Sequence, residues 1–157
     1  MSLLPVPAPP ASATTVQRWP ALHSSARALA LATAARADNR LWVVLVEDAR
    51  RLDQLRRELA FFAGDDLPVM ELPDWEVLPY DRYSPLPDLV SERIATLAKL
   101  PTLARGVLLV AAGTLLQRLP PVPYIAGRAF DLAVGQQFSM ARVSQQLAAA
   151  GYSHVAQ

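Results

Sequence analysis

Three carboxylates lie close together in a stretch that also carries prolines and aromatic side chains. Asp74, Glu76 and Asp81 fall between Leu72 and Pro87. Paired carboxylates can act as general acid and base, and grouped carboxylates can bind a divalent cation. Acidic residues in loops also cap helices and pair with arginines, and we favour that interpretation. The sequence therefore gives these three acids a structural role.

The turn before the first predicted helix is where an α/β protein would bind a nucleotide phosphate. A phosphate loop needs glycines, so that backbone amides can approach the phosphate oxygens, a lysine for the β- and γ-phosphates, and Ser or Thr for magnesium. The residues at this position are His23, Ser24, Ser25, Ala26, Arg27 and Ala28. They include no glycine and no lysine, and only Arg27 could contact an anion. The sequence predicts a degenerate phosphate loop that binds no nucleotide.

Four arginines on the helix predicted for residues 49–63 could contact a nucleic-acid backbone. They are Arg50, Arg51, Arg56 and Arg57. Asp53 and Glu58 are interleaved with them, and Asp53 is placed to pair with arginines on the next turn. The net charge of +1 also gives no bulk attraction to nucleic acid. We therefore interpret the four arginines as a solvated helix face.

Other catalytic and metal-binding arrangements are missing from the sequence. The chain has no cysteine, which excludes disulfides, thiolate metal sites and thiol catalysis. His23 and His154 lie too far apart in sequence for a recognisable metal site. Trp19, Trp42 and Trp75 lack interleaved basic residues, so we expect them to anchor the core and the loop rather than to stack on bases. We predict no catalytic residue, no metal and no cofactor site in this chain.

Arg93 is the charged residue that the apolar pattern places on a buried helix face. The helix predicted for residues 87–100 buries Leu89, Val90, Ile94, Leu97 and Leu100. Because an unpaired buried charge is costly, the guanidinium needs a partner. We predict that Arg93 pairs with one of the loop carboxylates and so ties the loop to the helix. The alternative is that its stem packs while its head reaches solvent.

The elements that position these residues alternate along the chain. At 157 residues, 52% hydrophobic and 18% charged, the sequence is typical of one well-cored domain, or of one domain and part of another. The apolar patterns predict, in order, helix 24–37, strand 41–46, helix 49–63, strand 68–72, the proline-aromatic loop, helix 87–100, strand 106–111 and a short helical turn at 113–118. Such alternation predicts right-handed crossovers and a parallel α/β sheet with flanking helices. The continuous apolar run at 41–46 predicts a strand covered on both faces.

The two ends of the chain differ in character from this centre. Residues 1–15 are rich in Pro, Ala, Ser and Thr, which predicts a disordered leader. After the prolines at 120–123 we expect a strand at 129–134, a helix at 139–149 and another strand at 152–156. A strand that stops mid-pattern indicates a truncated piece of a longer protein. No apolar run approaches the roughly 20 residues needed to cross a bilayer, and no signal peptide is evident, so we expect a cytoplasmic chain.

The loop and its flanks resemble one protein family. The matching pattern is Pro73-Asp74-Trp75-Glu76-x-Leu78-Pro79-Tyr80-Asp81, then Ser84-Pro85, then Ser91-x-Arg93-x-x-x-Leu97. Less specific matches begin near Leu22 and continue to Gly151-Tyr152-x-His154-Val155. The pattern is similar to the N-terminal region of bacterial transcription-repair coupling factor (Mfd). That region is a module like the excision-repair helicase UvrB.

The resemblance implies a RecA-like first domain without a working ATP site and a small second α/β domain inserted into it. Residues 16–127 would form the first domain, incomplete, and residues 128–157 the start of the second. The whole protein of that family is an ATP-driven translocase on double-stranded DNA that displaces stalled RNA polymerase. Its second domain recruits UvrA. ATP and magnesium would bind its C-terminal motor, and we expect the UvrA-contacting residues downstream of Gln157.

The resemblance therefore implies a non-catalytic module of a DNA repair translocase. Two other readings stay open from the residues alone. One is a small α/β nucleotide-binding domain of unrelated function, and the other is a scaffold that pairs through exposed apolar surface. For the scaffold, and for a truncated chain in general, we expect self-association.

Overall fold

The computed structural model describes residues 16–19, 21–78, 80–126, 129, 134–135, 137, 139–149, 151–153 and 155. The predicted leader at 1–15 lies outside the described residues. The chain divides into two compact units, the first ending at Arg118 and the second beginning at Leu119. The start of a second domain at residue 128 stays a prediction, because residues 127 and 128 are not among those described.

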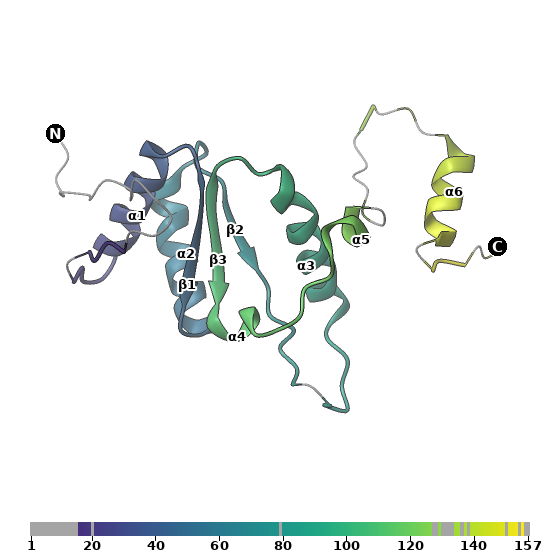
Figure 1. Cartoon of the computed structure of the whole chain (residues 1–157), viewed down its shortest axis with the longest axis horizontal. Helices are drawn as coiled ribbons and strands as arrows, with labels where there is room; N and C mark the ends of the chain where they lie inside the picture. Colours follow the sequence, from purple (N-terminus) through teal and green to yellow (C-terminus); the bar gives the residue numbers. More distant parts are fainter. Residues whose placement is uncertain are drawn as a thin grey trace. The chain divides into compact units, whose positions relative to one another are not determined.

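The first unit has a three-stranded parallel sheet with the strand order β1-β3-β2 (Figure 1). The strands are β1 (Leu41–Val46), β2 (Val69–Leu72) and β3 (Gly106–Ala111). β3 is central and every one of its residues is buried, as its uninterrupted apolar sequence predicts. The predicted parallel α/β fold is confirmed.

The described residues of this unit also form four α-helices: α1 (Ala26–Ala37), α2 (Ala49–Ala63), α3 (Pro87–Lys99) and α4 (Ala112–Leu115). A capping side chain, a glycine and a proline set the ends of α2 and the start of α3. The carboxylate of Asp48 accepts the amide of Arg51 at 2.8 Å and caps α2. Gly64, at φ +57°, ends α2, and Pro87 begins α3. The predicted bounds of α2 are confirmed, and α3 gives way to a 3₁₀ turn at Leu100–Thr102.

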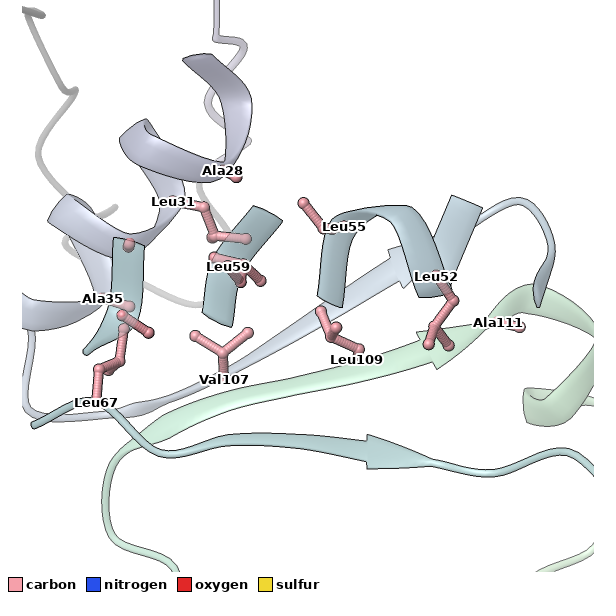
Figure 2. Close-up of a cluster of buried hydrophobic side chains, with 12 residues drawn as sticks. Ala28, Leu31, Ala35, Leu52, Leu55, Leu59, Leu67, Val107, Leu109 and Ala111 are labelled. Carbon is pink, nitrogen blue, oxygen red and sulfur yellow. The ribbon is translucent and has the colours of Figure 1, made fainter. Parts of the chain in front are cut away.

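The larger core cluster lies between the sheet and the helices α1 and α2. Figure 2 shows Leu52, Leu55 and Leu59 of α2 above Val107 and Leu109 of β3. The face that α1 contributes consists mostly of alanines, which let the two helices approach closely: Ala28, Ala32 and Ala35. This cluster holds one face of the sheet under a continuous helical layer.

The other face of the sheet is covered only in part. Leu108 and Val110 of β3 are buried there beside Leu72, and Leu97 and Leu100 pack against them. On β1, however, Val43 and Leu45 are each 56% exposed. The prediction that the strand at 41–46 is covered on both faces is therefore wrong. β1 is an edge strand, and no helix among the described residues covers its side of this face.

The second unit contains α5 (Val122–Ala126) and α6 (Met140–Ala149). The hydroxyl of Ser139 accepts the amide of Arg142 at 3.5 Å, and Gly151, at φ +95°, follows α6. The predicted strand at 152–156 is wrong for Tyr152, Ser153 and Val155, which are described and form no strand. A strand needs a neighbour for its amides, and no described residue of this unit supplies one. The predicted strand at 129–134 falls mostly outside the described residues.

None of the described helices combines the length and apolar character needed to cross a lipid bilayer.

Gly106 generates a specific prediction about the sheet. It has φ +136°, and a Cβ at this position would lie 2.7 Å from the carbonyl oxygen of Pro68. That oxygen accepts the amide of Val107 at 2.8 Å, so it cannot move away without breaking that hydrogen bond beside the start of β2. We expect Gly106→Ala to lower the free energy of unfolding by about 2 kcal/mol or more, measured by urea denaturation with circular dichroism.

Gly113→Ala is the matched control, because an added Cβ there meets nothing within 4 Å. It lies in α4, where alanine is the better helix former, so stability should stay the same or rise. Similar losses in both variants would show that the approach of Pro68 to Gly106 is not the cause.

Candidate functional site

The predicted phosphate turn leads directly into α1. Residues 21–23 before it form no strand, and Ser24 adopts φ +51°. Ser25 occupies the N-cap position of α1, but its side chain caps no amide. The amides of Ala26 and Arg27 donate to the carbonyls of His23 and Ser24, at 3.3 and 3.4 Å. Two of the amides that a phosphate would require are thus already used within the turn.

Charges of both signs surround this turn. Arg27 lines a cleft of about 130 Å³ at the carboxyl end of β1, together with Arg51, Glu47 and Glu58. Because the carboxylates balance the arginines, the cleft has no net positive charge to hold an anion. That no nucleotide binds here stays a prediction.

The arginines of α2 form the solvated face that their spacing predicts. Arg56 pairs with Asp53 at 2.9 Å, Arg57 also pairs with Asp53, and Arg51 donates to Gln54 at 2.9 Å. The hydrogen bond from Arg56 and the charge of Arg57 hold the pKa of Asp53 below its ordinary value. All four arginines of this face are exposed. The ion pairs on this face are confirmed.

Arg93 on α3 is buried, with only 1% of the residue exposed. One terminal nitrogen, Nη1, donates to the carbonyl oxygen of Pro73. The guanidinium carbon lies 4.8 Å from the centroid of the Trp75 ring, a cation–π distance. The other terminal nitrogen, Nη2, is buried without a hydrogen-bond partner. The connection from the loop to α3 therefore runs through a backbone carbonyl and an aromatic ring.

The predicted ion pair between Arg93 and a loop carboxylate is wrong. No ion pair involving Arg93 forms among the described residues. Burial lowers the pKa of Arg93, and the charge of Asp74 opposes that shift from a distance. The alternative that its head reaches solvent is wrong as well, because the side chain is fully enclosed.

Two of the three loop acids, Asp74 and Asp81, accept hydrogen bonds from other groups instead. Asp74 accepts the amide of Trp75 at 2.7 Å and the side-chain amide of Gln117. Asp81 accepts the amide of Leu78 at 2.8 Å. Short acidic side chains readily accept hydrogen bonds from backbone amides of their own turn. Here such hydrogen bonds compete with an ion pair to Arg93. Among the described residues, no group of three His, Cys, Asp or Glu side chains could hold a metal ion.

A cavity of about 630 Å³ opens at the carboxyl ends of β2 and β3. Asp74 and Glu76 follow β2 into it, Thr114 follows β3, and Glu92 reaches it from α3. Ligands of α/β proteins commonly bind at the carboxyl ends of parallel strands. This cavity is the candidate functional site of the first unit.

Two polar residues beside the cavity, Thr114 and Gln117, were not predicted as site residues from the sequence. Thr114 is fully buried and its hydroxyl has no hydrogen-bond partner. Gln117 uses its amide nitrogen on Asp74, while its carbonyl oxygen is buried without a partner. The signal that could have found them is their position directly after a fully apolar parallel strand. His23 is exposed in the turn before α1, and His154 lies outside the described residues.

Together, the fold and the site define a small parallel α/β module whose first turn lacks the glycines and lysine of a phosphate loop. Comparison with known proteins then points to one family. The chain is 43% identical to the transcription-repair-coupling factor of Escherichia coli over 115 residues, which are 73% of this chain and 10% of that protein.

Two further relatives carry the same name. The transcription-repair-coupling factor of Haemophilus influenzae is 35% identical over 132 residues, 84% of this chain and 11% of the relative. That of Rickettsia prowazekii is 32% identical over 110 residues, 69% of this chain and 10% of the relative. The chain thus resembles the transcription-repair-coupling factors over most of its length and spans about a tenth of theirs. No protein-family model matches the chain.

The burial of Arg93 leads to a second prediction. Arg93→Ala leaves a cavity and removes the bond to Pro73, so we expect the free energy of unfolding to fall by about 3 kcal/mol, measured by urea denaturation. Arg93→Met keeps most of the volume without the buried charge, and it should recover a large part of that loss.

The matched control is Arg57→Ala, which removes an exposed arginine from a surface ion pair and should change stability little. If Arg93→Met were as destabilising as Arg93→Ala, the charge and its bond to Pro73 would outweigh the packing of the stem.

Proposed function

We propose that this chain is a non-catalytic module of a transcription-repair coupling factor. The observation that carries the proposal is the 43% identity to such a protein over 73% of the chain. The turn before α1 supports the non-catalytic part, because it has no glycine, no lysine and two amides already bonded within it. In this proposal the module provides a surface for binding and catalyses no reaction.

The partners in this proposal follow from the family resemblance. The whole protein would act in the cytoplasm as an ATP-dependent translocase on double-stranded DNA and would displace stalled RNA polymerase. ATP and magnesium would serve its motor, outside this chain. The module would belong to the part that recruits UvrA, and the UvrA-contacting residues would lie downstream of Gln157. By itself, then, this chain should bind UvrA poorly.

An alternative function has an observation of its own. Val43 and Leu45 leave an apolar strip on the edge strand β1, and unpaired sheet edges that carry apolar side chains tend to associate. A scaffold that pairs through this strip would use the same fold without any role in repair. Self-association through this strip is what the scaffold requires, whereas the repair module does not depend on it.

Calorimetric titration of the chain with ATP and magnesium tests the non-catalytic proposal. We expect no saturable heat up to about 1 mM nucleotide, which corresponds to a binding free energy weaker than about 4 kcal/mol. Micromolar binding would overturn the proposal. If binding were found, Arg27→Ala would tell whether the turn before α1 is responsible, because Arg27 is its one cation.

Light scattering tests the association through β1. We expect the chain to self-associate as its concentration rises, and Leu45→Lys to suppress this by charging the exposed strip. Phe61→Lys is the matched control, because Phe61 is exposed on α2, and it should leave association unchanged. A chain that stays monomeric at high concentration would contradict this expectation.

A further inference from the structure

The cavity at the carboxyl ends of β2 and β3 is strongly acidic. Four of its lining residues are carboxylates: Glu71, Asp74, Glu76 and Glu92. Lys99 is the cation among its lining residues, which leaves a clear negative excess. Leu72 and Leu89 also line the cavity and make part of its wall apolar. A matching ligand would be positively charged and would carry an apolar stem.

The carboxylates of this cavity are incompletely neutralised by the chain itself. Glu71 faces Arg56 at 3.6 Å, with Asp53 and Glu92 as like-charged neighbours. Burial raises the pKa of Glu71 in spite of Arg56, and the two acidic neighbours add to that rise. No ion pair of Glu76 or Glu92 forms within the part of the chain that the structure describes. An added cation would therefore meet a favourable field.

A buried hydroxyl points to the same cavity independently of the charges. Thr114 lines the cavity, no part of it is exposed, and its Oγ1 has no hydrogen-bond partner. A buried polar group without a partner costs about 1–3 kcal/mol, so native chains rarely leave one unmatched. A ligand that donates a hydrogen bond at this depth would satisfy the Thr114 oxygen.

We propose that this cavity binds an arginine side chain of a partner protein. A guanidinium presents five donors in a planar fork, so one side chain can donate to carboxylate oxygens and to a hydroxyl oxygen at the same time. It is also more weakly hydrated than an ammonium, which reduces the cost of entering a half-apolar cavity. The arginine stem packs against Leu72 and Leu89. The proposal concerns the chain's own cavity and holds whether or not the proposed function is correct.

Nuclear magnetic resonance with N-acetyl-arginine amide as the probe tests the proposal. We expect saturable shifts of the backbone amides of Leu72 and Thr114 at millimolar probe concentrations. When the cavity is saturated with this probe, the pKa of Glu71 should move down towards its ordinary value, because a bound cation favours the ionised carboxyl. N-acetyl-norleucine amide has a similar stem without the charge and should produce neither effect.

Variants separate the cavity from general surface charge. Glu92→Gln should weaken probe binding several-fold, since it removes a carboxylate from the cavity. Thr114→Val should also weaken it while leaving the fold intact, because it replaces the unmatched hydroxyl with a methyl group of similar size. Glu47→Gln is the matched control, because Glu47 is an exposed acid that lines the other cleft, and it should leave binding unchanged.

Three results would overturn the proposal. The first is an absence of saturable shifts, and the second is an equal response to the norleucine probe. The third is equal binding of spermidine, which would show that the cavity selects for positive charge and not for an arginine side chain.

Discussion

The burial of the Arg93 guanidinium is the constraint that organises the loop and the candidate site. A charge with 1% exposure must be stabilised by fixed groups, and here these are the Pro73 carbonyl and the ring of Trp75. Both groups belong to the first residues after β2, so the chain has to leave the sheet along one path. Thr96 adds a second attachment, because its hydroxyl donates to the Glu71 carbonyl at 3.0 Å.

This path also determines where the polar residues of the cavity lie. Arg93 of α3 contacts Pro73 and Trp75 and so fixes Asp74, which lies between them. Asp74 then accepts a hydrogen bond from the side-chain amide of Gln117, a residue that follows β3. The segments after two neighbouring parallel strands are thereby joined, and the cavity forms where they meet. The unmatched hydroxyl of Thr114 and the excess of carboxylates both lie in this cavity.

One face of the sheet is covered by helices, and the other face is covered only in part. α1 and α2 cover one face through the larger core cluster, whereas the described chain leaves Val43 and Leu45 bare on the opposite face. An α/β sheet with an uncovered apolar edge is typical of a part that functions against other surfaces. That feature agrees with a chain that spans about a tenth of the transcription-repair-coupling factors it resembles.

The sequence by itself determined the main helices and strands of the first unit, because their signals are local. The strand ranges 41–46 and 106–111 and the helix range 49–63 were predictable from runs and spacings of apolar residues within a few turns or strand repeats. Only the tertiary structure decided the partner of Arg93, the exposed face of β1 and the cavity beside Thr114. Arg93 donates to the backbone carbonyl of Pro73. Because every residue type has a backbone carbonyl, no sequence pattern identifies which one will accept a hydrogen bond from a buried arginine. Asp74 and Asp81 accept backbone amides within their own turns, and these local bonds compete with the pairing to Arg93 that sequence proximity suggested.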